Sequence, residues 1–121
     1  MDKKYISFEE IVSYVNKLAD HIRNSNVTFK NVYGLPRGGL TPAVMLSHKM
    51  AIPLITDREK VSSDTLVVDE IIDKGDAILN NGFKDNYVVC LTLRYTSKYE
   101  PKFYAEKIED DTWLVFPWEE F

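Results

Sequence analysis

Two adjacent acids, Asp69 and Glu70, follow an apolar run and are the side chains best placed for chemistry. Ionised carboxylates only accept hydrogen bonds, so such a pair suits the two vicinal hydroxyls of a ribose. The turn from Asp73 to Asp76 then leads into a predicted helix and aims several free N–H groups at one point, while Gly75 lets the backbone approach a ligand closely. We interpret this turn as a phosphate site. The alternative is a solvated acidic corner in which Asp73 or Asp76 only caps the helix.

A second candidate is the segment Gly34–Pro42, which contains Arg37, Gly38 and Gly39. A guanidinium offers a fork of donors to phosphate oxygens, and the two glycines leave their N–H groups accessible. Taken alone, this segment is better explained as an ordinary turn.

The third candidate is aromatic and lies near the C-terminus, where Trp113 is followed by Leu114 and, after Pro117, by Trp118. A flat ring can stack on a flat base. The alternative is that both tryptophans are core or dimer-interface aromatics, and for Trp118 we favour that alternative.

The surrounding pattern predicts strands alternating with helices. Ser7 and Glu10 form a capping box ahead of an amphipathic helix over about 8–24. Further helices are predicted at about 41–49, with Thr41 as its cap, and around 77–80. Strands are predicted at 31–35, 52–55, 65–69 and 87–93, with weaker ones at 103–106 and 113–116. This alternation indicates an α/β fold with a mostly parallel sheet, in which ligands bind beyond the carboxyl ends of the strands.

Composition narrows the function classes. The 121 residues fit one domain, 1–121, and the net charge of −4 with a pI near 5.1 disfavours a nucleic-acid-binding surface. No apolar run reaches the length of a membrane span, and the N-terminus lacks an apolar signal core. Cys90 is the single cysteine, so no intrachain disulfide can form. We therefore expect a cytoplasmic protein without membrane partners.

Residues 67–77, Val-Val-Asp-Glu-Ile-Ile-Asp-Lys-Gly-Asp-Ala, resemble the phosphoribosyl-pyrophosphate (PRPP) motif of the type I phosphoribosyltransferases. In that family two acids follow an apolar strand, and two apolar residues then precede Asp-Thr/Ser-Gly-x-Thr. Lys74 and Ala77 depart from the motif, because they replace hydroxyl residues that hold the 5′-phosphate. Lys74 could supply a cation instead, whereas Asp76, at the variable position, would repel a phosphate that it faced.

The other two segments resemble the xanthine-guanine branch of the same family. Arg-Gly-Gly-Leu at 37–40 is similar to its pyrophosphate loop, and this resemblance implies that the peptide bond between Pro36 and Arg37 is cis or otherwise strained. The segment 113–119 is similar to its closing segment, Trp-x-x-x-Pro-Trp followed by an acid, whose aromatic ring stacks on the purine. Arg94 stands where these enzymes carry a lysine that donates to the purine 6-oxo group.

The resemblance implies a three-layer type I phosphoribosyltransferase fold with a minimal hood and a short flexible loop, 56–64. It implies transfer of 5-phosphoribosyl from Mg²⁺-PRPP to guanine, xanthine or hypoxanthine, as in purine salvage, by a homodimer. The residues assigned to each role are Asp73 for catalysis; Asp69, Glu70, Lys74, Gly75, Asp76 and Ala77 for the ribose and PRPP; Arg37, Gly38 and Gly39 for pyrophosphate; and Arg94, Trp113 and Leu114 for the purine.

Two points leave the function open at this stage. Magnesium is expected to bind mainly through substrate oxygens and water, so no protein ligand is assigned. The short loop and the lost hydroxyls also fit a non-catalytic module that binds PRPP or a nucleotide, or a scaffold that binds neither.

Overall fold

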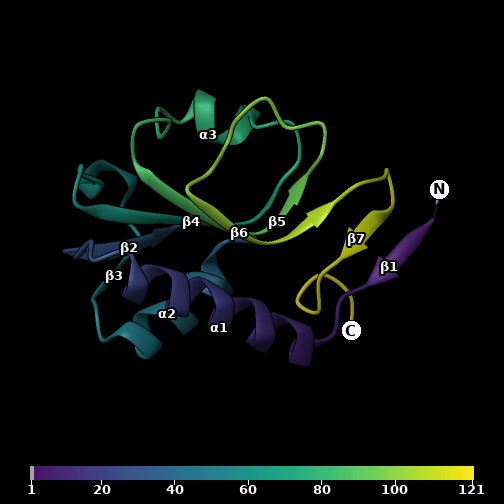
Figure 1. Cartoon of the computed structure of the whole chain (residues 1–121), viewed down its shortest axis with the longest axis horizontal. Helices are drawn as coiled ribbons and strands as arrows, with labels where there is room; N and C mark the ends of the chain where they lie inside the picture. The colour runs from purple at the N-terminus through teal and green to yellow at the C-terminus, as the bar shows by residue number, and fades with distance from the viewer. Residues whose placement is uncertain (1) are drawn as a thin grey trace.

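A five-stranded sheet in which every neighbouring pair is parallel forms the centre of the computed structural model, which describes residues 2–121 (Figure 1). The strand order is β3-β2-β4-β5-β6. The strands are β2 (Asn31–Gly34), β3 (Leu54–Ile55), β4 (Thr65–Ile72), β5 (Tyr87–Arg94) and β6 (Phe103–Ile108). The predicted α/β class and parallel sheet are therefore confirmed.

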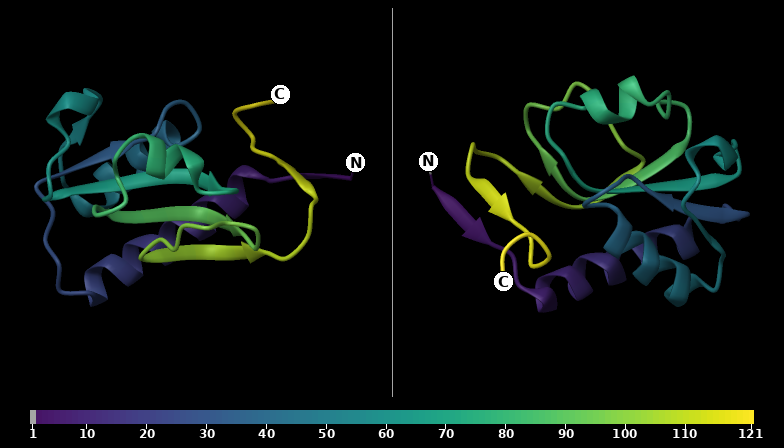
Figure 2. Two further views of the ribbon diagram at one scale, coloured as in Figure 1. Left: turned by 90° about the horizontal axis from the view of Figure 1, so that it is seen from above. Right: turned by 180° about the vertical axis from the view of Figure 1, so that it is seen from behind.

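Helices cover both faces of this sheet and make three layers (Figures 1 and 2). Helices α1 (Phe8–Asn24) and α2 (Leu40–Met50) lie on one face, and the short α3 (Asp76–Asn80) lies on the other. The capping box of Ser7 and Glu10 is present, so the start of α1 was predicted correctly. Among residues 2–121, no helix is long and apolar enough to cross a membrane.

The central strand β4 is buried from both sides, which explains its continuous apolar sequence. Leu66 and Val68 belong to the core beneath α1 and α2, whereas Val67 belongs to the core beneath α3. Each of these three side chains is fully buried. The two cores therefore pack against both faces of β4 and fix the position of the part of the strand that carries Asp69 and Glu70.

A small second sheet forms the hood at one end of the molecule (Figure 1). It pairs β1 (Lys3–Tyr5) with β7 (Trp113–Val115) in parallel, with Lys4 opposite Leu114. The sequence did not predict β1, because its three residues are exposed and show no apolar alternation. The hood thus depends on pairing between segments near the two ends of the chain.

Two of the predicted boundaries that were wrong lie beside the candidate site. Helix α2 begins at Leu40 with Gly39 as its N-cap and no capping side chain, so Thr41 is not the cap. Strand β4 does not stop at Asp69, because Ile71 and Ile72 still pair with β5. The two acids therefore lie within the last half of a paired strand and are held more firmly than loop residues would be.

The loop between β3 and β4 is short, as predicted, but it is also anchored. Its residues Arg58–Lys60 form a 3₁₀ turn capped by the Asp57 side chain. The Arg58 guanidinium donates to the backbone oxygen of Asn81 at 2.8 Å and lies 5.7 Å from the ring centre of Phe83. This loop is consequently tied to the end of α3.

The close packing of the loop after β2 gives a stability prediction. A Cβ added to Gly39 would lie 2.6 Å from the Val68 oxygen and 2.7 Å from the Leu35 oxygen, and backbone atoms cannot yield as a flexible side chain does. We expect Gly39→Ala to lower the free energy of unfolding by about 1–3 kcal/mol, the usual cost of overpacking. Urea denaturation measures this cost.

Gly82 supplies the matched control. It has a positive φ of 76°, but a Cβ there would meet nothing within 4 Å. Asparagine tolerates this backbone conformation, so Gly82→Asn should cost much less than Gly39→Ala. Equal costs at both positions would show that packing against β4 is not what requires glycine at 39.

Candidate active site

The pyrophosphate-type loop lies directly against the end of β4. Leu35 donates its backbone N–H to the Val68 oxygen at 2.9 Å, and Gly39 donates to the Leu35 oxygen at 2.8 Å. The peptide bond between Pro36 and Arg37 is cis, as the resemblance predicted. Arg37 and Gly38 are thereby presented at the carboxyl edge of the sheet.

Asp69 and Glu70 lie in the last half of β4 and are only partly exposed. The Glu70 backbone N–H donates to Asp69 Oδ1 at 2.8 Å. Burial raises the pKa of Asp69 to about 7; the neighbouring Glu70 charge adds to this effect, and the hydrogen bond opposes it. Burial also raises the pKa of Glu70 to about 7, helped by the Glu119 charge and opposed by a hydrogen bond from Trp118.

The Glu70 carboxylate reaches across the site toward both flanking segments. Its Oε2 accepts a hydrogen bond from Trp118 Nε1 at 2.8 Å. It also lies against Gly38, where an added Cβ would come within 2.0 Å of its carboxyl carbon. A cavity of about 690 Å³ opens here, between the loop of Arg37 and the C-terminal segment that carries Trp118 and Glu119.

The turn after β4 encloses a second cavity, of about 240 Å³. Gly75 takes a positive φ of 92° at the N-cap of α3, and a Cβ there would lie 2.8 Å from the Cβ of Tyr99. The cavity is lined by Asp69, Asp73 and the whole stretch Lys74–Ala77, among others. The structure therefore brings together every residue assigned to the ribose and PRPP except Glu70, which lines the two neighbouring cavities.

A charge on the next loop changes the electrostatics of this turn. Lys98 Nζ lies 2.5 Å from Asp76 Oδ1, and the Lys98 backbone N–H donates to the Lys74 oxygen at 3.1 Å. The hydrogen bond and charge of Lys98 lower the pKa of Asp76, with a smaller effect from Lys74. The repulsion expected from Asp76 is thus offset by two nearby cations.

A third cavity, of about 170 Å³, lies between β4 and the hood. Arg94, Trp113 and Leu114, the residues assigned to the purine, all line it, together with Asp73 and Glu70. Trp113 is 49% exposed, so about half of its surface is accessible to a ligand, whereas Leu114 is buried. The geometry suits a flat apolar ligand with a polar edge.

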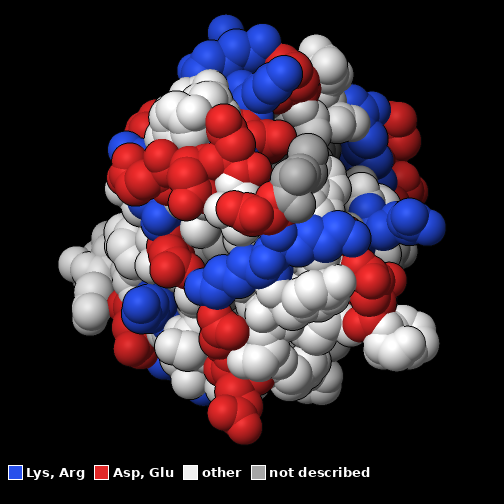
Figure 3. All heavy atoms as spheres, turned by 90° about the vertical axis from the view of Figure 1, so that its right-hand side faces the viewer, with Lys and Arg blue, Asp and Glu red and all other residues white. Residues whose placement is uncertain are grey.

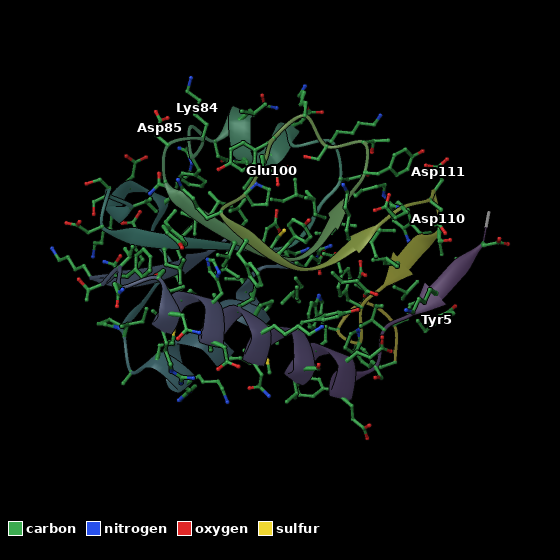
Figure 4. All side chains as sticks on the ribbon, viewed as in Figure 1. Tyr5, Lys84, Asp85, Glu100, Asp110 and Asp111 are labelled. Carbon is green, nitrogen blue, oxygen red and sulfur yellow. The ribbon has the colours of Figure 1, made fainter. Side chains whose placement is uncertain are left out.

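Two of the three guanidinium nitrogens of Arg94 contact the protein itself. Its Nε lies 2.8 Å from Asp73 Oδ1, and its NH1 donates to the backbone oxygens of Asp110 at 2.7 Å and Thr112 at 2.9 Å. Asp110 and Asp111 lie in the turn that joins β6 to the hood (Figure 4). Arg94 therefore holds this turn and orients the Asp73 carboxylate at the same time.

The end of the molecule that carries the hood has both acidic and basic side chains on its surface (Figure 3). On the face shown in Figure 3, a cluster of acidic side chains lies beside a band of Lys and Arg, and neither charge dominates. Within residues 2–121, no group of three or more His, Cys, Asp or Glu side chains is arranged to hold a metal ion.

Sequence reasoning missed several contacts around the site. Nothing in the sequence signalled that Lys98 would pair with Asp76 or that Arg94 would pair with Asp73. Trp118 packs against the core, as favoured, but its N–H also reaches Glu70. The acid after Pro-Trp was a usable signal for Glu119, because that position belongs to the quoted closing segment.

No family model matches the sequence. A curated relative, a xanthine-guanine phosphoribosyltransferase from Gluconobacter oxydans (strain 621H), is 22% identical, over 94% of this chain and 83% of the relative.

Two solved structures are similar over nearly their whole length. A purine phosphoribosyltransferase from Pyrococcus horikoshii Ot3 is 29% identical with a TM-score of 0.80, covering 100% of this chain and 96% of the other. The Helicobacter pylori xanthine-guanine-hypoxanthine phosphoribosyltransferase is 19% identical with a TM-score of 0.84, covering 97% and 92%. The chain therefore has the type I phosphoribosyltransferase fold, and the resemblance to the 6-oxopurine branch that its motifs predicted is confirmed.

Proposed function

We propose that this protein transfers a 5-phosphoribosyl group from PRPP to N9 of a 6-oxopurine and releases pyrophosphate. The observation that carries the proposal is that Asp73 and Glu70 each line two of the three neighbouring cavities. Asp73 lines both the phosphate-turn cavity and the purine-type cavity, and Glu70 lines both the latter and the cavity beside Arg37. Sites for a phosphate, a base and a pyrophosphate thus surround one acidic centre suited to a ribose.

Each segment then has a role in the reaction. Asp69 and Glu70 accept hydrogen bonds from the ribose hydroxyls, and the backbone from Lys74 to Ala77 holds the 5′-phosphate. The bond from ribose C1 to the pyrophosphate oxygen breaks as the bond from C1 to purine N9 forms. Asp73 acts at purine N7 as general base or hydrogen-bond partner, and Arg94 keeps its carboxylate oriented.

Pyrophosphate leaves into the cavity beside Arg37. The Arg37 guanidinium and the backbone N–H groups around Gly38 stabilise its negative charge there. Magnesium is part of the proposal. The residues fit an ion bound mainly through PRPP oxygens and water, because the described chain offers carboxylates here but no three-ligand cluster. When bound, the ion would neutralise charge on the leaving pyrophosphate.

The finer expectations from the resemblance also belong to this proposal. They are a role in purine salvage, a cytoplasmic location and a homodimer. In support of a dimer, Val12 and Val44 are exposed on the neighbouring helices α1 and α2, and dimer interfaces bury apolar surface of this kind.

The deciding experiment measures steady-state release of pyrophosphate from Mg²⁺-PRPP with guanine, hypoxanthine, xanthine, adenine and orotate. We expect turnover with at least one 6-oxopurine and none with orotate. Nucleotide binding by calorimetry without any turnover would favour a binding module instead. Absence of both turnover and binding would favour a scaffold.

Asp73 provides the first test of mechanism. We expect Asp73→Asn to lower turnover by about 100-fold or more, because a positioned acid–base group usually contributes that much. Nucleotide binding should be largely kept, since asparagine can still accept from Arg94. Unchanged turnover in the variant would remove Asp73 from the mechanism.

Lys74 tests the altered phosphate turn. We expect Lys74→Ala to weaken binding of a nucleoside 5′-monophosphate about tenfold, equivalent to about 1.4 kcal/mol. The corresponding nucleoside, which lacks the phosphate, should bind the variant and the parent alike. Titration calorimetry at one fixed ionic strength measures both affinities, because salt screens such a contact.

Ala77→Thr is the opposite change and restores a hydroxyl at the turn. It should tighten binding of the monophosphate. If Lys74→Ala leaves the affinity for the monophosphate unchanged, Lys74 is a solvated turn residue and the phosphate is held by backbone N–H groups alone.

The raised pKa values predict the pH dependence of binding. Asp69 and Glu70 have pKa values of about 7, so each gains a proton as the pH falls through 7 and then accepts hydrogen bonds less well. We expect the affinity for a ribonucleotide to rise between about pH 6 and pH 8. In Asp69→Asn, which cannot ionise at 69, the affinity should be lower and depend less on pH.

The same two carboxyls should make the stability of the folded protein fall as the pH rises, which is the opposite of the trend in binding. A pKa raised in the folded state means that the folded protein binds the proton more tightly, so each acid lowers stability as the pH rises from about 4 to 7. At pH 8, Asp69→Asn should therefore unfold at a higher temperature than the parent. A lower unfolding temperature would show that burial does not penalise this carboxylate.

A further inference from the structure

The hydrogen bond between Trp118 and Glu70 joins the C-terminal segment to the acidic centre. Trp118 Nε1 donates to Glu70 Oε2 at 2.8 Å between residues 48 positions apart in the sequence. Within residues 2–121 no other side chain or backbone group donates to this carboxylate. The contact therefore leaves Oε1 available as a hydrogen-bond acceptor.

Glu70 needs such a contact because its side chain is long. Its backbone is fixed within β4, but a glutamate has three rotatable side-chain bonds, and ordering them costs conformational entropy. Gly38 limits the carboxylate from one side, since an added Cβ would come within 2.0 Å of its Cδ. Trp118 supplies the complementary directional contact.

The turn that carries Trp118 is itself well ordered. Glu119 Oε1 accepts from the Phe116 backbone N–H at 2.8 Å, and the Glu119 N–H donates to the Phe116 oxygen at 2.9 Å. The rings of Phe116 and Trp118 stack with centroids 5.4 Å apart and planes 13° apart, and Phe116 is buried. The indole N–H is thus aimed at Glu70 before any ligand arrives.

We infer that Trp118 is a positioning residue for ribose recognition: its N–H fixes one oxygen of Glu70 so that the other meets a ribose hydroxyl. This inference rests on the proposed function, in which Glu70 holds the ribose. The contrasting explanation is that only the ring of Trp118 matters, as core packing, and phenylalanine would then serve equally well.

Trp118→Phe separates the two explanations, because it keeps an aromatic ring and removes the N–H. Calorimetry compares guanosine 5′-monophosphate with its 2′-deoxy and 3′-deoxy forms. The parent should prefer the ribonucleotide to at least one deoxy form, and Trp118→Phe should lose about threefold to tenfold of that preference, part of a charge-assisted bond. An unchanged preference would overturn the inference.

Trp113→Phe is the matched control, since it makes the same change at the other tryptophan. It alters the ring that faces the purine cavity, so it should weaken all three nucleotides by the same factor and keep the preference. Glu70→Gln gives the second control, because Trp118→Phe in that background should change the preference much less than in the parent. Equal effects in both backgrounds would mean that Trp118 acts elsewhere.

A measurement without ligand keeps the inference distinct from the proposed function. In the Trp113→Phe protein, the single indole N–H signal in an NMR spectrum belongs to Trp118. We expect Glu70→Gln to shift this signal and to speed its exchange with solvent. If the parent protein binds no nucleotide, the proposed function and the inference both fail. If it binds nucleotides but Glu70→Gln leaves the indole signal unchanged, the inference alone fails.

Discussion

The rest of the site depends on two carboxylates near the end of β4, those of Asp69 and Glu70, which are largely buried. Removing a carboxylate from water is costly, and here it raises the pKa values of Asp69 and Glu70 to about 7. The cost is tolerable because β4 is anchored by two cores and the acids receive hydrogen bonds from the Glu70 N–H and from Trp118. Glycine at 38 follows from the same constraint, since any side chain would occupy the place of the Glu70 carboxylate.

The turn after β4, where we propose that the 5′-phosphate binds, departs from the family motif in its side chains but keeps the glycine. Hydroxyl residues of the family motif are replaced at Lys74 and Ala77, yet Gly75 still brings the backbone close to the cavity. Lys98, from the loop after β5, pairs with Asp76 and so offsets a negative charge that would oppose a phosphate. In the proposed function, the cation of Lys74 replaces one of the two hydroxyl donors, and Ala77 replaces the other without a donor. Binding of the 5′-phosphate should then depend more on salt, because exposed charges are screened.

The sequence predicted those parts of the molecule that depend on local patterns. The capping box of Ser7, the buried strand β4 and the order of the three motifs all follow from neighbouring residues. Side-chain contacts between distant segments could not be predicted, because they depend on where a side chain points: the indole of Trp118 reaches an acid 48 positions away. The short strand β1 was missed for a related reason, since it exists only through its pairing with β7.

Arg94 shows why a departure from a family pattern can be understood only in three dimensions. An arginine carries five N–H donors in a fixed fork, whereas a lysine carries three on a flexible stem. Here Nε of Arg94 pairs with the Asp73 carboxylate, and NH1 donates hydrogen bonds to the backbone oxygens of Asp110 and Thr112. The remaining nitrogen keeps two donors, which in the proposed function are the ones left for a purine 6-oxo group. One buried guanidinium thus links the hood turn, the Asp73 carboxylate and the cavity lined by Trp113, so a change in the hood turn would alter the position of Asp73.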